Sequence, residues 1–462
     1  MKRAIALLVA VGASVVAVPA AAQAAPPGVE WRSCGNSGAQ CGSVSVPLDW
    51  TKPNAGRISV AVARVSAADP ARRIGALFIN FGGPGAPAVS VVRDEVQEAF
   101  PADLRARFDI VGVDPRGVGD SVPAITCPKP PQDPKITQFP RTEEQFQRLV
   151  AYNREVAQSC RQATGPLIDH ADTVNTAKDF DAVRIALGES KVSWLGLSYG
   201  TLLGSTYARL FPNRVRSAVL DGAVDHALGP RRMVADETRV YEDVFRLFAK
   251  WCAEDTSCAL HGHDVVAEYR ALLERAERTP IPAEGIPDGV SAEEIGYAVY
   301  SAIYLRDNWA PLAQVLTEVL TPTPNAARFA GAHTDAAYRV IACHDFPSDV
   351  RSLADLTARR QEALRLAPVT RGYVEGWDVQ AGCAGWPVKA NYPWGNYPVR
   401  GVSNVLVVGG EHDPSTPLPW AIGLACQIQG SRLIVSHEVG HTAYFNDPAT
   451  RQREVDHLLS AA

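Results

Sequence analysis

Gly196-Leu197-Ser198-Tyr199-Gly200 is the stretch that decides the fold class of this chain. It lies between an apolar run at residues 192–195 and a run of helical character at residues 201–210. A strand that turns sharply into a helix around Gly-x-Ser-x-Gly is typical of a nucleophile elbow. The glycines leave room for the cramped backbone of the serine, and the helix N-terminus favours negative charge beside it. The pattern therefore predicts that Ser198 is a nucleophile on a strand-to-helix turn.

The composition is that of a large globular protein. The chain has 462 residues, 46% of them hydrophobic, which is enough for a sizeable buried core. Its net charge of −5 gives no reason to expect nucleic acid or an anionic membrane as a partner. No Cys-x-x-Cys pair occurs. We therefore expect no metal and no cofactor, and we expect a monomer.

The first residues have the form of an export signal. Lys2 and Arg3 precede an apolar stretch at residues 5–18, and Ala22-Gln23-Ala24 has the small-x-small pattern that signal peptidase recognises. We predict a signal peptide at residues 1–24 and a secreted, extracellular mature protein. No later stretch approaches about 20 consecutive apolar residues, so we expect no membrane association after the signal is removed.

The nine cysteines suit an oxidising compartment. Proximity in sequence favours four disulfides, which are Cys34–Cys41, Cys252–Cys258, Cys127–Cys160 and Cys343–Cys383. Cys426 is left over in an apolar helical run, and we expect it to be a buried hydrophobic side chain.

The alternation of strand-like and helical runs predicts an α/β fold. Strand-like runs occur within residues 42–65 and at residues 74–81, 108–113, 192–195, 218–220, 404–408 and 432–436. Residues 176–187 have helical periodicity, with Thr176 and Asp179 spaced as in a capping box. Apolar strands that alternate with helices are typical of a parallel sheet covered on both faces.

The pattern changes in the second half of the chain. Residues 226–394 are mostly of helical periodicity, with a Pro-rich break at residues 279–289. We therefore expect a core made of residues 25–225 and 396–462, interrupted by a mainly helical cap at residues 226–395. Such a cap would cover the carboxyl ends of the strands, where sites in open α/β sheets lie.

A serine nucleophile needs a base and an orienting acid, which follow it in this order as acid and then histidine. Asp413 and His441 each come shortly after a late strand-like run, so we expect both to converge on Ser198. His437 is an alternative base, and Glu411 and Asp221 are alternative acids. His412 adjoins Asp413 and is expected to be a surface or supporting residue.

Two further loops follow early strands. The first reads Asn80-Phe81-Gly82-Gly83-Pro84-Gly85, where glycines would let backbone N–H groups approach a substrate oxygen. The backbone N–H of Tyr199 is the expected second donor of this oxyanion hole. The other loop reads Asp114-Pro115-Arg116-Gly117-Val118-Gly119-Asp120-Ser121, and we expect Asp114 and Arg116 to brace the site by binding loop amides and carbonyls.

Together these motifs resemble the α/β-hydrolase peptidases. With Cys343-His344-Asp345 and Cys383-Ala384-Gly385-Trp386-Pro387 added, the chain looks like the secreted tripeptidyl aminopeptidases and related proline-type aminopeptidases of actinobacteria. The resemblance runs from about residue 30 to the end. It implies an α/β-hydrolase fold, a mostly parallel sheet flanked by helices with a large helical cap.

The resemblance also implies site residues. Ser198, Asp413 and His441 would form the catalytic triad, and Gly83 with Tyr199 would form the oxyanion hole. The chain departs from the family pattern at Phe81, where His or Pro is usual, and at Ala86-Pro87-Ala88, which replaces a glycine- and serine-rich run. Both departures adjoin the first subsite, so Phe81 and Gly82 are candidate substrate contacts.

The leading hypothesis is a serine exopeptidase that releases short peptides, tripeptides above all, or single residues from free N-termini. Such an enzyme must bind an α-ammonium group, so a cap carboxylate should face the site. The candidates are Glu237 and Asp345, and also Asp236, Glu293 and Glu294. The alternative hypotheses are a hydrolase of carboxylic esters, lactones or other small molecules, and a non-catalytic binding protein on the same scaffold.

Overall fold

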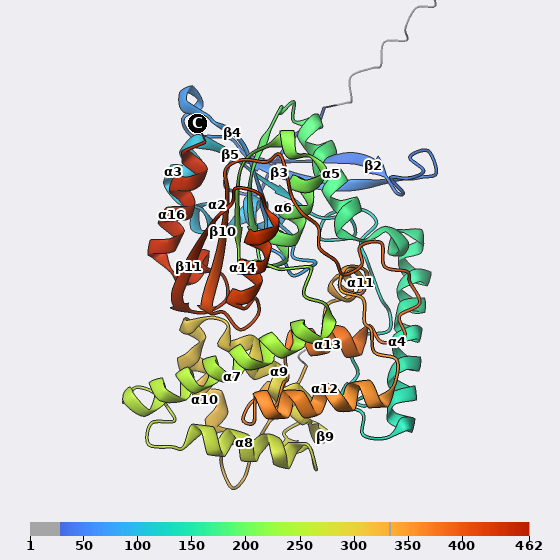
Figure 1. Ribbon diagram of the computed structural model, residues 1–462, viewed down its shortest axis with the longest axis vertical. Helices are drawn as coiled ribbons and strands as arrows, with labels where there is room; N and C mark the ends of the chain where they lie inside the picture. Colours follow the sequence, from blue (N-terminus) through green and yellow to red (C-terminus); the bar gives the residue numbers. More distant parts are fainter. Residues whose placement is uncertain (1–27, 332–333, 462) are drawn as a thin grey trace, which may run out of the picture.

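Nine strands form one sheet in the order β1-β2-β3-β5-β4-β6-β7-β10-β11 (Figure 1). The computed structural model describes residues 28–331 and 334–461, so the expected signal peptide at residues 1–24 lies outside them. Strands β1 to β3 pair antiparallel, and the strands from β5 to β11 run parallel. The strands are β1 (Arg32–Cys34), β2 (Ala39–Pro47), β3 (Arg57–Val65), β4 (Gly75–Asn80), β5 (Phe108–Val113), β6 (Val192–Leu197), β7 (Val215–Asp221), β10 (Val405–His412) and β11 (Arg432–Val439).

Helices cover both faces of this sheet. Alternate residues of the central strands point to opposite faces, so that Leu77 and Leu195 pack in one apolar cluster and Phe78 and Trp194 in another. One face is covered by α1 (Val89–Asp94), α2 (Val96–Ala99), α3 (Ala102–Arg107), α15 (Ala443–Asn446) and α16 (Pro448–Leu459). The other carries α4 (Glu143–Thr164), α5 (Thr173–Ala186), α6 (Tyr199–Leu210) and α14 (Leu418–Gln427). Strands β4, β5 and β6 are buried along their whole length, which explains why their sequences are mostly apolar and do not alternate with polar residues.

A mostly helical layer lies between β7 and β10 in sequence and beside the sheet in space (Figure 1). It contains α7 (Pro230–Glu254), α8 (Val265–Ala276), α9 (Ala292–Ile303), α10 (Trp309–Thr317), α11 (Ala336–Asp345), α12 (Leu353–Leu366) and α13 (Glu375–Gly382). The Pro-rich stretch forms a small hairpin of β8 (Ile281–Ala283) and β9 (Ile286–Val290), which the sequence did not indicate. The start of α4 packs into the apolar cluster of this layer through Phe146, Leu149 and Val150, so α4 joins the two layers.

The start of α5 differs from the expectation. The helix begins at Thr173, three residues before Thr176, and the Asp172 side chain caps it by accepting from Asn175 N at 3.0 Å. Thr176 donates its hydroxyl to the carbonyl of Asp172 instead of capping. Asp179 binds Arg116 and Trp50, so the expected capping box does not form.

The structure contains four disulfides, and their pairing is the one expected from proximity. They join Cys34 to Cys41, Cys127 to Cys160, Cys252 to Cys258 and Cys343 to Cys383. The expectation for Cys426 is wrong, because this free cysteine is exposed. Its helix α14 packs on the sheet through Trp420, Ala421 and Leu424, and Cys426 falls outside that face.

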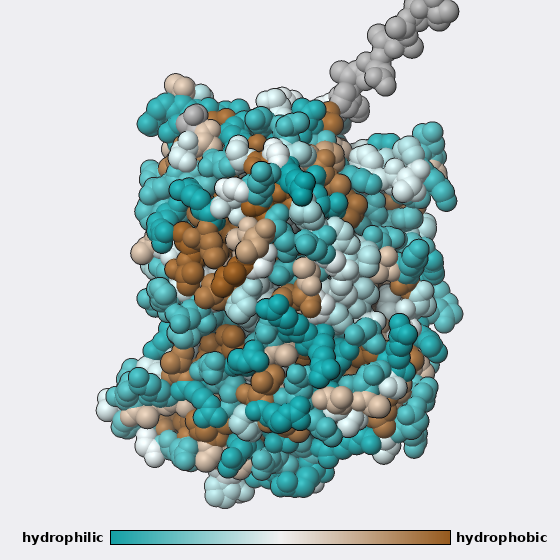
Figure 2. Space-filling model, viewed as in Figure 1, coloured by the Kyte–Doolittle hydropathy of each residue, from teal (hydrophilic) through white to brown (hydrophobic). Residues whose placement is uncertain are grey.

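The surface is largely hydrophilic, with a hydrophobic area over β11 and α14 (Figure 2). Ile422 of α14 and Leu433 of β11 are 46% and 36% exposed. Strand β11 is the edge of the sheet, which explains why its outer side chains lack cover. Within the described ranges, none of the helices combines the length and apolar character needed to cross a bilayer.

Candidate active site

Ser198 occupies the turn between β6 and α6 in a strained backbone conformation, with φ 56° and ψ −127°. Positive φ is uncommon for a residue other than glycine and is tolerated where the surroundings fix it. A Cβ at Gly196 would lie 2.3 Å from the carbonyl oxygen of Gly200, and one at Gly200 would lie 2.4 Å from that of Asn80. Both glycines are therefore required by close backbone packing, which is the physical basis of the Gly-x-Ser-x-Gly pattern.

The glycine-rich loop after β4 lies against this turn. A Cβ at Gly82 would lie 2.9 Å from both the Cβ of Ser198 and the backbone nitrogen of Tyr199. Gly82 also has φ +91°, a conformation that favours glycine. Only a residue without a side chain lets the loop approach the serine so closely.

Ser198 and His441 line one cavity of about 790 Å³. The loop residues Phe81, Gly83 and Gly85 form part of its wall on the core side. The opposite wall comes from the cap and is rich in tyrosine. Its residues include Tyr297, Tyr300, Tyr304, Tyr338 and Glu375.

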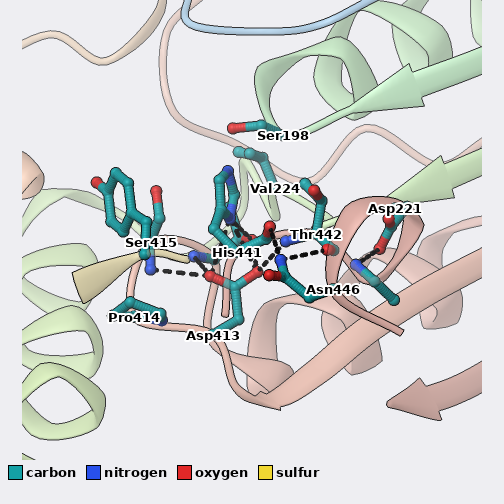
Figure 3. Close-up of polar contacts among 12 residues, drawn as sticks. Ser198, Asp221, Val224, Asp413, Pro414, Ser415, His441, Thr442 and Asn446 are labelled. Atoms are coloured by element: carbon teal, nitrogen blue, oxygen red, sulfur yellow. Dashed lines mark hydrogen bonds and ion pairs between the residues drawn. The ribbon is translucent and has the colours of Figure 1, made fainter. Parts of the chain in front are cut away.

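The imidazole of His441 is held by Asp413 (Figure 3). His441 Nδ1 lies 2.9 Å from each carboxylate oxygen of Asp413. Asp413 is fully buried and accepts from the backbone N–H groups of Ser415 and Thr416, both at 2.9 Å, and from the Thr416 hydroxyl at 2.7 Å. These donors fix the carboxylate so that it orients the ring.

The two groups shift each other's protonation. Burial alone would raise the pKa of Asp413, but the charge and hydrogen bond of His441 and the Thr416 donors lower it below its ordinary value. Burial alone would lower the pKa of His441, but Asp413, and then Glu375 and Asp221, raise it above its ordinary value. The pairing therefore stabilises the imidazolium that forms when His441 accepts a proton.

The ring of His441 stands between Asp413 on one side and Ser198 on the other (Figure 3). Among the hydrogen bonds of the described residues, none joins the Ser198 hydroxyl to His441. Catalytic hydrogen bonds are often long without substrate and tighten when it binds.

The alternative bases and acids lie elsewhere. His437 is exposed and its Nδ1 lies 2.7 Å from Glu411, so this pair faces solvent. Asp221 accepts from the backbone N–H groups of Ala443 and Tyr444, and burial raises its pKa to about 6. It thereby caps α15 and supports the loop that carries His441. His412 lies at the end of β10 and does not line the cavity.

Residues 437–441 read His-Glu-Val-Gly-His, the spacing that places two zinc ligands on one helix face in metalloproteases. Here the segment is the end of β11 and the following loop, and the two rings bind different carboxylates. Over residues 28–331 and 334–461, no cluster of three or more His, Cys, Asp or Glu side chains is arranged to hold a metal ion.

Asp114 and Arg116 brace the site as expected. Asp114 accepts from the backbone N–H groups of Ala88, Val89 and Asp120, which folds the segment after the glycine-rich loop. Arg116 is fully buried and pairs with Asp179 at 2.6 Å while donating to the carbonyls of Leu48 and His170.

The expected cap carboxylates do not line the cavity. Asp345 is buried and binds Thr173 and Tyr199, and Glu237 is buried and accepts from Gly376 N at 2.6 Å. Glu293 binds Thr137 and Gln138, Glu294 completes a capping box with Ser291, and Asp236 pairs with Arg232 and Arg239. Each is already engaged by neighbours of its own.

Sequence reasoning missed the three carboxylates that line the cavity, which are Glu375, Asp335 and Asp378. Asp378 pairs with the buried Arg339, and Asp335 caps α11 by accepting from the backbone N–H groups of Ala337 and Tyr338. Glu375 has neither role. It lines the cavity at the first residue of α13 and accepts from Tyr338, from Ser415 at 3.1 Å and from Tyr304 at 3.4 Å. Within the described part of the chain, no Lys or Arg pairs with it. Nothing in its local sequence distinguishes it from other acidic residues.

Burial raises the pKa values of the neighbouring carboxyl groups Glu375 and Glu237. Burial, and then the charge of Glu375, raises the pKa of Glu237 well above its ordinary value. Burial also raises the pKa of Glu375, but the Tyr338 hydrogen bond, His441 and Ser415 oppose this effect. A cation placed beside Glu375 would add to the groups that favour its charged form.

Comparison with known proteins agrees with this architecture. A family model described as alpha/beta hydrolase fold matches residues 75–279, and one described as TAP-like protein matches residues 368–462. The chain is 33% identical to a tripeptidyl aminopeptidase of Streptomyces coelicolor, over 91% of this chain and 81% of the relative. It is 32% identical to the serine protease Hip1 of Mycobacterium tuberculosis, over 90% and 86% of the two chains. A carboxylesterase B of Mycobacterium tuberculosis is 31% identical, over 88% and 81%.

Proposed function

The chain belongs to the α/β-hydrolase family of tripeptidyl aminopeptidases and related serine peptidases, which makes it a serine hydrolase of the peptidase type, and from this premise we propose that it is a secreted exopeptidase. It releases short peptides, tripeptides above all, from free N-termini. The four disulfides support an oxidising compartment outside the cytoplasm.

Ser198 is the proposed nucleophile, with His441 as base and Asp413 as the acid that orients it. Ser198 Oγ attacks the substrate carbonyl while His441 accepts the hydroxyl proton, which it then returns to the leaving amine. Water, activated by the same imidazole, releases the acyl group from Ser198. The contact of His441 Nδ1 with both oxygens of Asp413 supports these roles, because it leaves the other ring nitrogen for Ser198.

The proposed oxyanion hole consists of the backbone N–H groups of Gly83 and Tyr199. Two donors aimed at the developing negative charge stabilise the tetrahedral intermediate. The close approach of Gly82 to Ser198 and Tyr199 supports this assignment, since it brings the glycine-rich loop to the serine. Phe81 lies on the cavity wall and would contact the first substrate residue.

The observation that carries the exopeptidase proposal is Glu375. This carboxylate borders the catalytic cavity and, among the described residues, accepts only from neutral hydroxyls, so no Lys or Arg there neutralises it. A bound cation would stabilise its charged form against the burial that raises its pKa. The α-ammonium of a peptide supplies such a cation, and an N-acylated peptide or a simple ester does not. Glu375 is thus the proposed anchor for the substrate N-terminus, in place of Glu237 and Asp345.

A panel of aminocoumarin reporters tests the proposal. Unblocked amides of one, two and three residues are compared with the N-acetylated three-residue amide and a short-chain p-nitrophenyl ester. We expect the unblocked three-residue amide to be cleaved best and its acetylated form about 100-fold more slowly, since a hydrogen bond between charged groups contributes about 2 to 3 kcal/mol. A Ser198→Ala variant is the control, and undiminished turnover by it would refute the proposal.

The similarity to a carboxylesterase favours a second candidate, a carboxylic-ester hydrolase on the same scaffold. In that case the ester would be turned over best and acetylation of the peptide would make no difference. The reporter panel therefore separates the two functions.

A further inference from the structure

Helix α11 extends from the substrate cavity to the turn that carries Ser198. At its beginning, Tyr338 lines the cavity and donates to Glu375. Its backbone also packs on the glycine-rich loop, because a Cβ at Gly85 would lie 3.1 Å from Tyr338 N. Its last residue, Asp345, contacts Tyr199, the residue directly after Ser198. One cap helix therefore touches both segments that supply the proposed oxyanion hole.

The contact at the end of α11 is a closed ring of three polar groups. Asp345 Oδ2 lies 2.8 Å from the Tyr199 hydroxyl and 2.7 Å from the Thr173 hydroxyl, and the two hydroxyls lie 2.6 Å apart. The second carboxyl oxygen accepts from Thr173 N at 3.1 Å. All three residues are buried, so water does not compete for these bonds.

The ring has three oxygen–oxygen contacts, but its two hydroxyl groups supply only two hydrogens for them. Two hydroxyl hydrogens serve two of the three oxygen–oxygen contacts, and a proton on the Asp345 carboxyl serves the third. The surroundings favour that proton, since burial and then the charge of Asp172 raise the pKa of Asp345 to about 7. The other titratable neighbour is His226, whose Nε2 contacts the backbone oxygen of Asp345 and whose pKa is lowered by burial to about 4.

The two residues before Asp345 fix the same end of the helix. Cys343 is joined to Cys383 at the end of α13, and His344 Nε2 lies 2.7 Å from the carbonyl oxygen of Ile168. The Cys343-His344-Asp345 segment thus binds three separate parts of the molecule. A disulfide and several hydrogen bonds therefore hold the end of α11 beside Tyr199.

We infer that Asp345 is a positioning residue, which holds the Tyr199 side chain and so keeps the backbone N–H of Tyr199 aimed at the oxyanion. The inference rests on the proposed role of that N–H group. Small displacements of a reacting group or of an oxyanion donor are costly, because transition-state stabilisation depends on preorganised geometry. Through Asp345, the cap that binds the substrate also sets the geometry of the hole.

Steady-state kinetics of Asp345→Ala, Asp345→Asn and Tyr199→Phe test the inference on the best reporter substrate. We expect Asp345→Ala to lower kcat about 30-fold with KM changed less than about twofold, as partial loss of one oxyanion donor implies. Asp345→Asn should keep kcat within about threefold of the parent, because its amide donates to both hydroxyls while its oxygen accepts from Thr173 N. Tyr199→Phe should lower kcat about 10-fold without a change in KM.

Glu242→Ala is the matched control. Glu242 is also a buried cap carboxylate, and it accepts from the N–H and hydroxyl of Thr370 as Asp345 does from Thr173, but it lies in no contact with the site. Its loss should lower Tm and leave kcat unchanged. A folded Asp345→Ala protein with normal kcat overturns the inference, as does an Asp345→Asn protein as impaired as Asp345→Ala.

If Asp345→Ala does not fold, the Tyr199→Phe variant tests the inference instead. A kcat equal to that of the parent enzyme in Tyr199→Phe overturns it. Ser198→Ala separates this result from a failure of the proposed function. If Ser198→Ala is inactive while the Asp345 and Tyr199 variants behave as the parent, only the positioning role is lost. If Ser198→Ala is fully active, the proposed function itself is lost.

Discussion

His441 Nδ1 lies at the same distance, 2.9 Å, from both carboxylate oxygens of Asp413. The loops that carry the two residues follow adjacent parallel strands, β10 and β11, so the contact between them follows from the strand order. The charge of Asp413 raises the pKa of His441 despite burial. Because a general base must be neutral, kcat/KM should fall on the acidic side at a higher pH than an unperturbed imidazole would give.

Asp413→Asn should lower kcat by about 10⁴-fold, since the imidazole loses the partner that fixes its tautomer. The acidic limb of kcat/KM should also move to lower pH, because the charge that raised the pKa of His441 is gone. Glu411→Gln is the matched control, as Glu411 binds the exposed His437. The assignment would be contradicted if Glu411→Gln shifted the acidic limb of kcat/KM and Asp413→Asn did not.

Gly82→Ala should inactivate the enzyme without unfolding it. The added Cβ would lie 2.6 Å from the carbonyl oxygen of Leu197 and 2.9 Å from Tyr199 N, so the glycine-rich loop must shift away from the serine. We expect kcat to fall by about 100-fold or more, as for loss of an oxyanion donor.

Gly188→Ala separates backbone strain from the contact at Gly82. Gly188 also has positive φ, at +72°, but its Cβ would meet nothing within 4 Å. We expect a loss of about 1 kcal/mol in the free energy of unfolding and an unchanged kcat. Equal activity of the two variants would show that the loop does not need its close approach to Ser198.

Glu375→Gln should raise KM for unblocked peptides by about 30-fold, which corresponds to about 2 kcal/mol for a hydrogen bond between charged groups. Turnover of N-acetylated peptides and esters should change less than about threefold, because these substrates carry no α-ammonium. Measurements at a pH well above the acidic limb exclude effects through His441. Glu293→Gln, which alters another cap glutamate with its own partners, should leave the preference for a free amine intact.

Removing the disulfide between Cys343 and Cys383 should lower the free energy of unfolding by about 4 kcal/mol, given a sequence separation of 40. The matched pair Cys252 and Cys258, with a separation of 6, should cost about 2 kcal/mol. Urea unfolding of the two double Cys→Ala variants measures both values. Only the first variant should also lower kcat, because Cys343 helps to fix the end of α11.

Local sequence patterns predicted most of the fold. Strands β4, β5 and β6 are buried along their length and are therefore mostly apolar in sequence. The elbow is a strand, a turn and a helix that adjoin in sequence. Ser198, Asp413 and His441 each come shortly after a strand that the sequence indicates, so their positions at strand ends could be predicted. The disulfide pairing agreed with sequence proximity, because each cysteine is bonded to a partner between 6 and 40 residues away.

The residue that caps α5 and the exposure of Cys426 were harder to predict from the sequence. Thr176 and Asp179 have capping-box spacing, yet Asp172 caps the helix because Asp179 is drawn into a buried pair with Arg116. Cys426 lies in an apolar run but on the solvent side of α14. In both cases a distant partner or the rotation of a helix outweighs the local pattern.

By itself the sequence determined the α/β-hydrolase architecture, the serine turn, and the late acidic residue and histidine that follow strands. Only the tertiary structure decided which cap carboxylates border the cavity, and these are Glu375, Asp335 and Asp378 rather than Glu237 and Asp345. It also joined Asp345 to Tyr199, which lie 146 positions apart. The physical reason is that strands and turns depend on neighbouring residues, whereas the direction of a helical side chain depends on how its helix packs on elements remote in sequence.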